Sequence, residues 1–550
     1  MEDLHVLERI DAIVQRALDE SEAQGMAVGI ATRTGDRILR TYGFANRDAE
    51  TPVGEETLFE IGSISKSFLA IVFLQLAAEG KIDLHAPVTD YLPWFSVSSD
   101  HAPITTHHLL CHTAGLPTGL AHRPDGILEL WELRNVRAGA PGEFWHYSDV
   151  GYSLLGVLVE TVLGQPFDTI LTERVLEPLG FDSAVASVTS EMRPLLAVGY
   201  KRQFDERPWR SGGSVSPAIW LETSSGAGSI VMDVSSMLGY AEFLLRTWHG
   251  EDSPVLPRAQ LRAMVDPSLL PSPAVEEGYG YGLSWGTDAD FDTPDQVVFL
   301  GHGGDMVGYE SDLIVDIANG ICVVMLASGA VSDYQMTNDL RKLVVASIAG
   351  EPLPELTTET LRFYEGADAW TGEWRSAQRA IEIVLADDGL TLIDAQQRSP
   401  VQRYSRRSNS SLSVAHPDWD RFLLEAERDD NDDGTLGPIV KLHHGGETFV
   451  RDGAPRPEIS DYPSEWNGYI GLYRSYNPWY PAIRIVLREG ALVLFDAGGA
   501  ASTLVPEDDG FRVGKEPPNF DWLRFDPVID GQAQGIHFET GADYSRFFGA

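Results

Sequence analysis

A serine and a lysine lie three residues apart at the start of an apolar run. Ser63 and Lys66 stand in "FEIGSISKSFLAIVFLQLAAEG", residues 59–80. On a helix this spacing places both side chains on one face, within reach of each other. A lysine among apolar neighbours loses proton affinity through desolvation, so Lys66 could accept the proton of a serine nucleophile. The alternative is an ordinary helix start with a snorkelling lysine, because S-x-x-K alone recurs by chance in many proteins.

Two later stretches contain further groups suited to acyl transfer. Tyr147 in "PGEFWHYSDVGYSLLGVLVE" precedes a predicted helix, and a tyrosine held near a lysine can carry a proton. In "FLGHGGDMVGY", Gly303 and Gly304 let a substrate backbone approach a strand edge, and the N–H of Asp305 can face an oxyanion. The alternatives are a packed aromatic at Tyr147 and a Gly-rich hairpin with a surface histidine at residue 302.

Taken together, the three stretches resemble the motifs of the serine β-lactamase and penicillin-binding-protein superfamily. Those motifs are S-x-x-K, then Y-x-N, then K-T-G or its H-x-G variant, in that order. "ITTHHLLCHTAGLP" and "YGYGLSWG" are similar to other landmarks of class C β-lactamases and of their esterase and D-aminopeptidase relatives. The resemblance covers about residues 10–350.

The resemblance implies a role for each matching residue. Ser63 would be the nucleophile, with Lys66 and Tyr147 as the proton-transfer pair. The N–H groups of Ser63 and Asp305 would form the oxyanion hole. The substrate-binding positions would be Asp149, His302, Gly303 and Gly304. No cofactor is implied.

Two positions depart from the family pattern. Asp149 stands where asparagine is usual, and an ionised aspartate only accepts hydrogen bonds. It could pair with Lys66 and shift the role of base to Tyr147, receive a substrate ammonium, or cap the helix; these three alternatives stay open. His302 stands where lysine is usual and is mostly neutral at pH 7, so a β-lactam carboxylate would be held poorly. Efficient β-lactamase activity is therefore disfavoured.

A histidine-rich segment, "THHLLCH", contains His107, His108, Cys111 and His112. The spacing of His108 and His112 would allow a metal to bind on a helix. However, the segment coincides with a structural landmark of the family, and no fourth ligand with suitable spacing is evident. We therefore expect no metal site, and we expect Cys111 and Cys322 to be buried thiols rather than a disulfide framework.

The elements that must position these residues follow an α+β order. Periodicity predicts a helix over residues 3–23, a hairpin turning at 34–36, and helices over 63–79 and 150–163. Three strands are predicted within 297–327. Early strands, a helical middle and late strands indicate an antiparallel sheet covered by helices, which is the β-lactamase-like domain that the resemblance implies.

The remainder of the chain contains an internal repeat. "GEWRSAQRAIEIVLADDGLTL" begins at residue 372 and "GLYRSYNPWYPAIRIVLREGALVL" at residue 471, and both contain alternating apolar strands. Pro-rich breaks surround the copies. We predict a catalytic domain over 1–350 and two small antiparallel β-barrels over 362–450 and 464–550. This layout resembles D-aminopeptidases, in which a barrel loop restricts substrate size.

Charge narrows the classes of partner. The formal net charge of −41 opposes binding to nucleic acids or anionic membranes. The excess of acidic residues and of arginine over lysine is similar to proteins of salt-loving organisms. The N-terminus contains no signal-peptide pattern and no window is apolar enough for a transmembrane helix, so a cytoplasmic location is expected. A homo-oligomer stays open.

These observations predict a cofactor-independent serine hydrolase that forms an acyl-enzyme on Ser63. Its expected substrates are small molecules or short peptides, and a peptidase or amidase with D-configured substrates is favoured over a carboxylesterase. The alternative from another class is a non-catalytic binding or sensor protein that keeps the fold.

Overall fold

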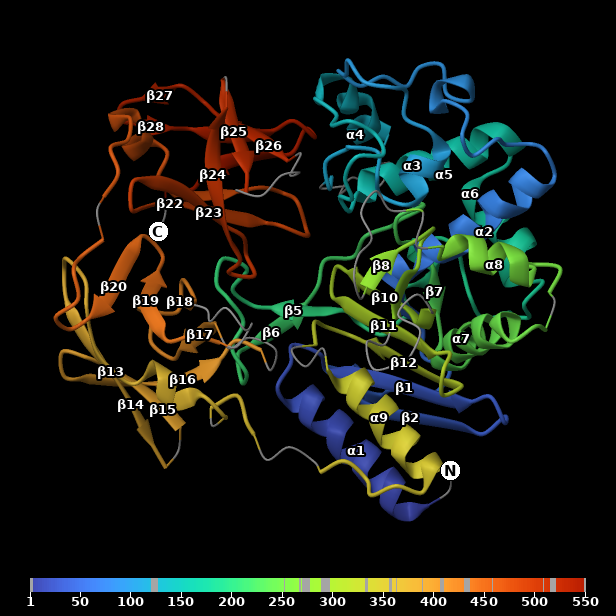
Figure 1. Cartoon of the computed structure of the whole chain (residues 1–550), viewed down its shortest axis with the longest axis horizontal. Coiled ribbons are helices and arrows are strands. Elements are labelled where there is room, and N and C mark those ends of the chain that lie inside the picture. The colour runs from blue at the N-terminus through green and yellow to red at the C-terminus, as the bar shows by residue number, and fades with distance from the viewer. Residues whose placement is uncertain are drawn as a thin grey trace.

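The computed structural model contains a sheet-and-helix domain followed by two barrels (Figure 1). It describes residues 3–119, 127–251, 253–266, 269, 277–287, 297–331, 335–355, 359–362, 364–387, 389–405, 410–429, 436–457, 459–507, 509–514 and 521–548. The predicted fold class is confirmed: a helix-covered antiparallel sheet precedes two closed barrels of eight antiparallel strands each.

The first domain is built on an eight-stranded sheet with the order β3-β2-β1-β12-β11-β10-β9-β8. Its strands are β1 (Gly25–Thr32), β2 (Arg37–Asn46), β3 (Thr51–Pro52), β8 (Glu277–Tyr279), β9 (Ser284–Thr287), β10 (Val297–Met306), β11 (Tyr309–Asp316) and β12 (Ile321–Ala327). The predicted hairpin joins β1 to β2, and the three predicted strands are β10, β11 and β12. The sheet therefore joins the two ends of this domain through the β1–β12 pair.

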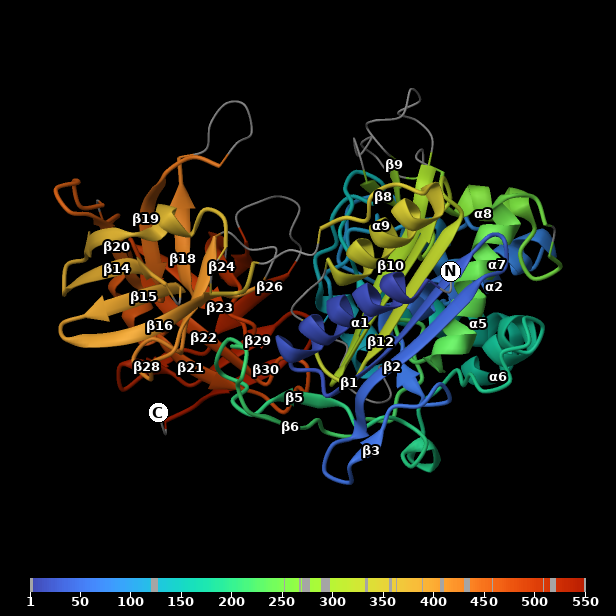
Figure 2. The same ribbon diagram turned by 90° about the horizontal axis from the view of Figure 1, so that it is seen from below.

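Helices cover both faces of this sheet (Figure 2). Helices α1 (Leu4–Asp19) and α9 (Met336–Ala349) pack on one face, where Val28 and Val323 are buried. Helix α7 (Val234–Trp248) packs on the other face, against residues such as Val324. Because successive side chains of a strand point to opposite faces of the sheet, each strand supplies buried side chains to the helical layers on both faces.

A helical region extends beyond the second face. It contains α2 (Ser65–Ala78), α3 (Thr106–Leu110), α4 (Ile127–Glu132), α5 (Asp149–Leu163), α6 (Phe167–Leu171) and α8 (Arg258–Met264). Helix α2 is apolar on all sides because it lies in the centre of the main core. Helix α5 begins at the Ser148 cap, whose side chain accepts from the N–H of Gly151, and ends at Gly164 in the left-handed conformation.

Each copy of the repeat forms one closed barrel. The strands of the first are β13 (Gly372–Arg375), β14 (Ala380–Ala386), β15 (Gly389–Asp394), β16 (Gln397–Arg403), β17 (Ser411–Val414), β18 (Leu424–Arg428), β19 (Ile439–His444) and β20 (Glu447–Arg451). Those of the second are β21 (Gly471–Arg474), β22 (Ala482–Arg488), β23 (Ala491–Phe495), β24 (Ala501–Glu507), β25 (Gly510–Val513), β26 (Trp522–Phe525), β29 (Gly535–Phe538) and β30 (Asp543–Arg546). Trp374 pairs with Ile381, and Tyr473 pairs with Ile483 in the same register. The predicted duplication is therefore visible in the strand pairing.

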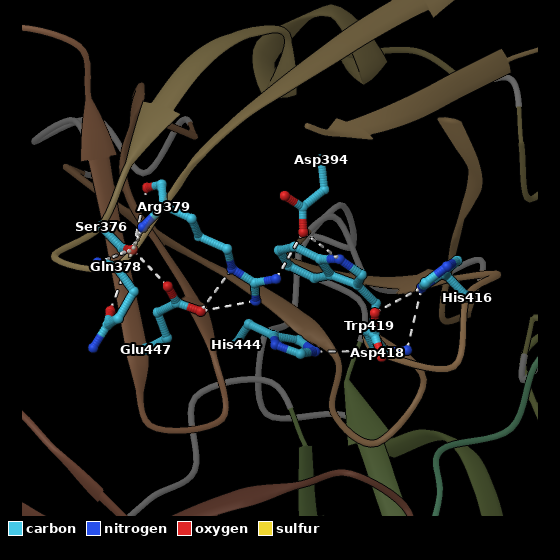
Figure 3. A network of polar contacts seen from close by, with 9 residues as sticks. All are labelled: Ser376, Gln378, Arg379, Asp394, His416, Asp418, Trp419, His444 and Glu447. Atoms are coloured by element: carbon cyan, nitrogen blue, oxygen red, sulfur yellow. Dashed lines mark hydrogen bonds and ion pairs between the residues drawn. The ribbon is translucent and has the colours of Figure 1, made fainter. Parts of the chain in front are cut away.

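One end of the first barrel is closed by a polar network around Arg379 (Figure 3). The guanidinium lies 2.7 Å from Asp394 and 2.8 Å from Glu447, and its carbon lies 4.2 Å from the centroid of the Trp419 ring. His444 Nε2 hydrogen-bonds the carbonyl of Trp419 at 3.0 Å. The barrel thus satisfies the charges at this end with its own side chains.

A hairpin of the first domain reaches the barrels (Figure 1). It consists of β5 (Tyr200–Arg202) and β6 (Val215–Pro217). Between its strands, Asp205 pairs with Arg474 of the second barrel at 2.6 Å, and Arg207 pairs with Asp420 of the first barrel at 2.6 Å. The hairpin therefore ties both barrels to the domain that contains the three motifs.

Two further expectations concern helices and thiols. Among the described helices, none is by itself long and apolar enough to cross a membrane; α5 and the segment Phe167–Leu176 pass that test only as a pair, bent by 83° at a short break. Cys111 and Cys322 are both buried and free, as predicted.

Candidate active site

Ser63 lies on a tight turn that leads directly into helix α2. The turn is the 3₁₀ segment Gly62–Ile64, and Lys66 follows in the first turn of the α-helix. Lys66 Nζ lies 2.8 Å from Ser63 Oγ, so the predicted contact between the two side chains is present. Gly62 has a φ of +51°, and a Cβ there would lie 2.6 Å from the amide nitrogen of Asp305. This glycine allows the turn to lie against β10.

The ammonium group of Lys66 has a partner for each of its three protons. Besides Ser63 Oγ, it contacts Asp149 Oδ1 at 2.7 Å and the carbonyl of Ala227 at 2.7 Å. The Lys66 side chain is fully buried. Burial lowers its pKa below the ordinary range, and the Asp149 carboxylate opposes that effect only in part. The neutral amine is therefore more accessible than in an exposed lysine.

Tyr147 lies beside Ser63 and Lys66. It lines the same two cavities as Ser63, and Lys66 Nζ lies 5.0 Å from the centroid of its ring. Burial, together with the nearby Asp149 carboxylate, raises the pKa of Tyr147 well above its usual value. The resting tyrosine is thus a neutral phenol that can donate a proton, and Lys66 is the better placed acceptor of the two.

Strand β10 presents an open edge to Ser63. Its pairing with β9 ends at Gly301, whereas its pairing with β11 continues as far as Met306. Among the described residues, the backbone of His302–Met306 therefore has no strand partner on one side. A Cβ at Gly304 would lie 2.0 Å from the carbonyl oxygen of Ile61, whereas Gly303 is exposed and uncrowded. Gly304 is thus required by the approach of the serine turn itself.

His302 is buried and uncharged at neutral pH. Its Nδ1 donates to the carbonyl of Gly303, so its Nε2 accepts from the Tyr279 hydroxyl at 2.9 Å. Burial and the charge of Lys66 lower the pKa of His302 to about 4. The third motif therefore supplies no cation for a substrate carboxylate.

Two cavities open at Ser63, one on each side. The first has a volume of about 320 Å³ and lies between Ser63, Asp149 and two aromatic residues of the second barrel, Trp479 and Tyr480. The second has a volume of about 600 Å³ and is bounded by His302, Gly303, Asp305 and other residues of β10 to α9. Sequence reasoning did not identify the two aromatic residues, although a longer loop in the second copy of the repeat, "SYNPWYP" against "SAQR", was a visible signal.

The residues of the histidine-rich segment have separate partners. His107 Nδ1 contacts the Tyr281 hydroxyl at 2.7 Å, and His108 Nδ1 accepts from the N–H of Thr105 at 3.2 Å. His112 lies beneath Tyr147 instead. Among the residues that the structure describes, no group of three or more His, Cys, Asp or Glu side chains is arranged to hold a metal ion.

Comparisons with known proteins agree with this geometry. A family model described as beta-lactamase matches residues 10–347. The chain is 36% identical to the esterase EstB of Burkholderia gladioli over 195 residues, which cover 31% of this chain and 49% of that protein. It is 34% identical to a beta-lactamase of Pseudomonas fluorescens over 220 residues, 39% of this chain and 61% of that protein. Each match thus spans roughly half of the relative.

Two longer matches extend further along the chain. Penicillin-binding protein 4 of Amycolatopsis lactamdurans is 28% identical over 375 residues, 64% of this chain and 92% of that protein. The structure of the octameric penicillin-binding protein homologue from Pyrococcus abyssi superposes with a TM-score of 0.56 at 20% sequence identity, over 81% of this chain and 100% of that chain. The second match shows the fold.

Proposed function

The chain belongs to the beta-lactamase family, and on this premise we propose that it hydrolyses small amides with a free amino group through an acyl-enzyme on Ser63. The observation that carries the proposal is the cavity beside Ser63, which contains the Asp149 carboxylate and has Trp479 and Tyr480 in its wall. Such a space accepts a short acyl group and not a long one.

In the proposed mechanism, Ser63 Oγ attacks the substrate carbonyl while its proton passes to the neutral amine of Lys66. The N–H groups of Ser63 and Asp305 hold the oxyanion that forms. The phenol of Tyr147 then protonates the leaving nitrogen as the C–N bond breaks, and the proton on Lys66 restores the phenol. Water subsequently attacks the acyl ester and gives a proton to Lys66. As the acid leaves, Lys66 returns this proton to Ser63 Oγ, which regenerates the serine and the neutral amine.

Asp149 supports a preference for substrates with an ammonium group. Its Oδ1 is engaged with Lys66, and its side chain remains 33% exposed in the cavity. Its Oδ2 accepts no hydrogen bond from the described residues and can receive a donor from the substrate. The resemblance to D-aminopeptidases favours a D-configured substrate. The helix-capping alternative does not apply, because the cap of α5 is Ser148.

A carboxylesterase is the second candidate. An ester leaves as an alkoxide or phenolate and needs less help from Tyr147 than an amine does. The 36% identity to an esterase over 195 residues is the observation that favours it. Efficient β-lactamase action stays disfavoured, because the neutral His302 offers no charge to the carboxylate of a β-lactam.

A fluorophosphonate probe tests the acyl-enzyme. We expect covalent labelling of the full chain that disappears in Ser63→Ala and persists in Ser153→Ala, in which another hydroxyl group of the same cavity is removed. Absence of labelling across a wide range of pH and salt would instead support the non-catalytic sensor. D- and L-aminoacyl p-nitroanilides, their N-acetylated forms and p-nitrophenyl esters then separate the candidates, since equal rates for free and acetylated amines would refute the role of Asp149.

We also propose a homo-oligomer, because the P. abyssi homologue with the same fold is described as octameric. Light scattering during size-exclusion chromatography at high salt measures the mass directly, and a single mass equal to 60.4 kDa would refute the proposal.

A further inference from the structure

His112 occupies a backbone position that usually belongs to glycine. It follows the last residues of α3 with a φ of +58°. The N–H of Thr113 bonds the carbonyl of His108 at 2.8 Å, and the N–H of His112 faces the carbonyl of Leu109 at 3.4 Å. This is the hydrogen-bond pattern of a helix C-terminus that favours glycine in the left-handed residue. A histidine in this conformation costs about 1–2 kcal/mol, so its side chain must contribute elsewhere.

His112 contacts Tyr147 and also the residues directly before and after it in the chain. Its carbonyl accepts from the N–H of His146 at 2.8 Å, and its Nδ1 accepts from the N–H of Ser148 at 3.0 Å. Its ring lies 4.3 Å from the Tyr147 ring, centroid to centroid, at an angle of 36°. The residues before and after Tyr147, and the ring itself, are thus all held by one histidine.

We propose that His112 is a positioning residue that fixes the Tyr147 hydroxyl against Ser63 through these three contacts. This proposal rests on the proposed function, since Tyr147 there donates the proton to the leaving group. Because Nδ1 accepts a hydrogen bond, the ring proton is on Nε2, and the ring must stay neutral to keep the contact. Complete burial near Lys66 lowers the pKa of His112 well below its usual value, so the ring stays neutral across the working pH range.

Two substitutions separate the side chain from the backbone. His112→Gly and His112→Asn both tolerate a positive φ, but only asparagine keeps a side-chain acceptor close to the position of Nδ1. We expect His112→Gly to lower kcat for an aminoacyl p-nitroanilide about 10-fold to 100-fold, with KM within about threefold of the wild-type value. Fluorophosphonate labelling should stay within about threefold of wild type, because its fluoride leaving group needs no proton from Tyr147. We expect His112→Asn to keep both rates within about threefold of wild type.

His108→Ala is the matched control. His108 also accepts a backbone N–H with its Nδ1, at the other end of α3, and its loss removes the contact with Thr105. We expect this variant to lower Tm without a change in kcat of the folded protein for the p-nitroanilide.

The outcomes distinguish this proposal from the proposed function. If the wild-type chain is not labelled at Ser63, the proposed function fails and His112 loses its role with it. If the wild type is labelled but folded His112→Gly hydrolyses the p-nitroanilide equally fast, only the positioning role is overturned. Equal losses in His112→Asn and His112→Gly would also overturn it, because the retained acceptor would then have no effect.

Discussion

The substitution Asp149→Asn tests which group accepts the proton of Ser63. It restores the asparagine that is usual in the family and removes the charge next to Lys66 Nζ, where the carboxylate lies 2.7 Å away. An adjacent opposite charge shifts a pKa by about 1–3 units. Because the Asp149 side chain is 33% exposed, solvent screens the pair in part, so the effect of the substitution falls in the lower part of that range.

The direction of the shift follows from the two effects on Lys66. Burial lowers its pKa and Asp149 raises it, so removal of the carboxylate lowers the pKa further. A lower pKa increases the fraction of neutral lysine at every pH below it. The acidic limb of the acylation profile should therefore move to lower pH, and labelling at a pH below both limbs should be about 10-fold to 100-fold faster.

The assay is the second-order rate of Ser63 labelling by a fluorophosphonate, measured from about pH 5 to pH 10 at constant salt. Glu160→Gln is the control, because it removes another carboxylate from the same cavity. The Glu160 carboxylate accepts a hydrogen bond from the N–H of Phe167 and has no contact with Lys66 among the described residues. Its acidic limb should coincide with that of the wild type. A limb that stays in place in Asp149→Asn, or that moves to higher pH, would refute the assignment of Lys66 as proton acceptor.

Three further substitutions test the cavity wall, the serine turn and the first barrel. Trp479→Ala should enlarge the cavity and raise kcat/KM for longer acyl groups relative to short ones by about tenfold. Tyr476→Ala, on the exposed part of the same loop, should leave this ratio unchanged. An unchanged chain-length profile in Trp479→Ala would contradict the role of Trp479. Gly62→Ala should slow labelling by about 100-fold or more, because its Cβ would displace the N–H of Asp305. Gly80 also has a positive φ, but a Cβ there would meet open space, so Gly80→Ala should only lower the free energy of unfolding by about 1 kcal/mol. Wild-type labelling in Gly62→Ala would show that the contact with β10 is dispensable. Arg379→Met should lower the free energy of unfolding, measured in urea titrations, by about 3 kcal/mol, because Asp394 and Glu447 lose their shared partner. Arg375 is more exposed, so Arg375→Met should lower it by at most about 1 kcal/mol. Equal effects of the two substitutions would contradict a structural role for the network around Arg379.

The sequence was sufficient for the elements and for the residues of the motifs. Helical spacing placed Ser63 next to Lys66, because local patterns record local geometry. Tyr147 and His302 were brought in by the order of the motifs in the resemblance to a family. The sequence could not decide which group the Asp149 carboxylate contacts. Its partner depends on where helix α5 begins relative to α2, and Lys66 and Asp149 are 83 positions apart along the chain.

Other features depend on tertiary packing that no local pattern encodes. The left-handed conformation of His112 has no sequence signal, since only a few per cent of residues other than glycine adopt it. The contribution of Trp479 follows from how the second barrel docks, through the ion pair of Arg474 with Asp205. The expectation of a salt-loving origin, from the net charge of −41, and of a cytoplasmic location both stay predictions.

The duplicated barrels show how one loop position acquired two uses. In the first barrel the connection between β13 and β14 is residues 376–379, and it ends at Arg379, which closes its own barrel. In the second barrel the equivalent connection, residues 475–481, is three residues longer. The N–H of Trp479 donates to Asn477 Oδ1 at 2.9 Å, and the carbonyl of Tyr480 accepts from the Tyr544 hydroxyl at 2.9 Å. The longer loop is thus held by its own barrel while Trp479 and Tyr480 line the cavity at Ser63, so the first copy uses this position for stability and the second uses it to form the wall of that cavity.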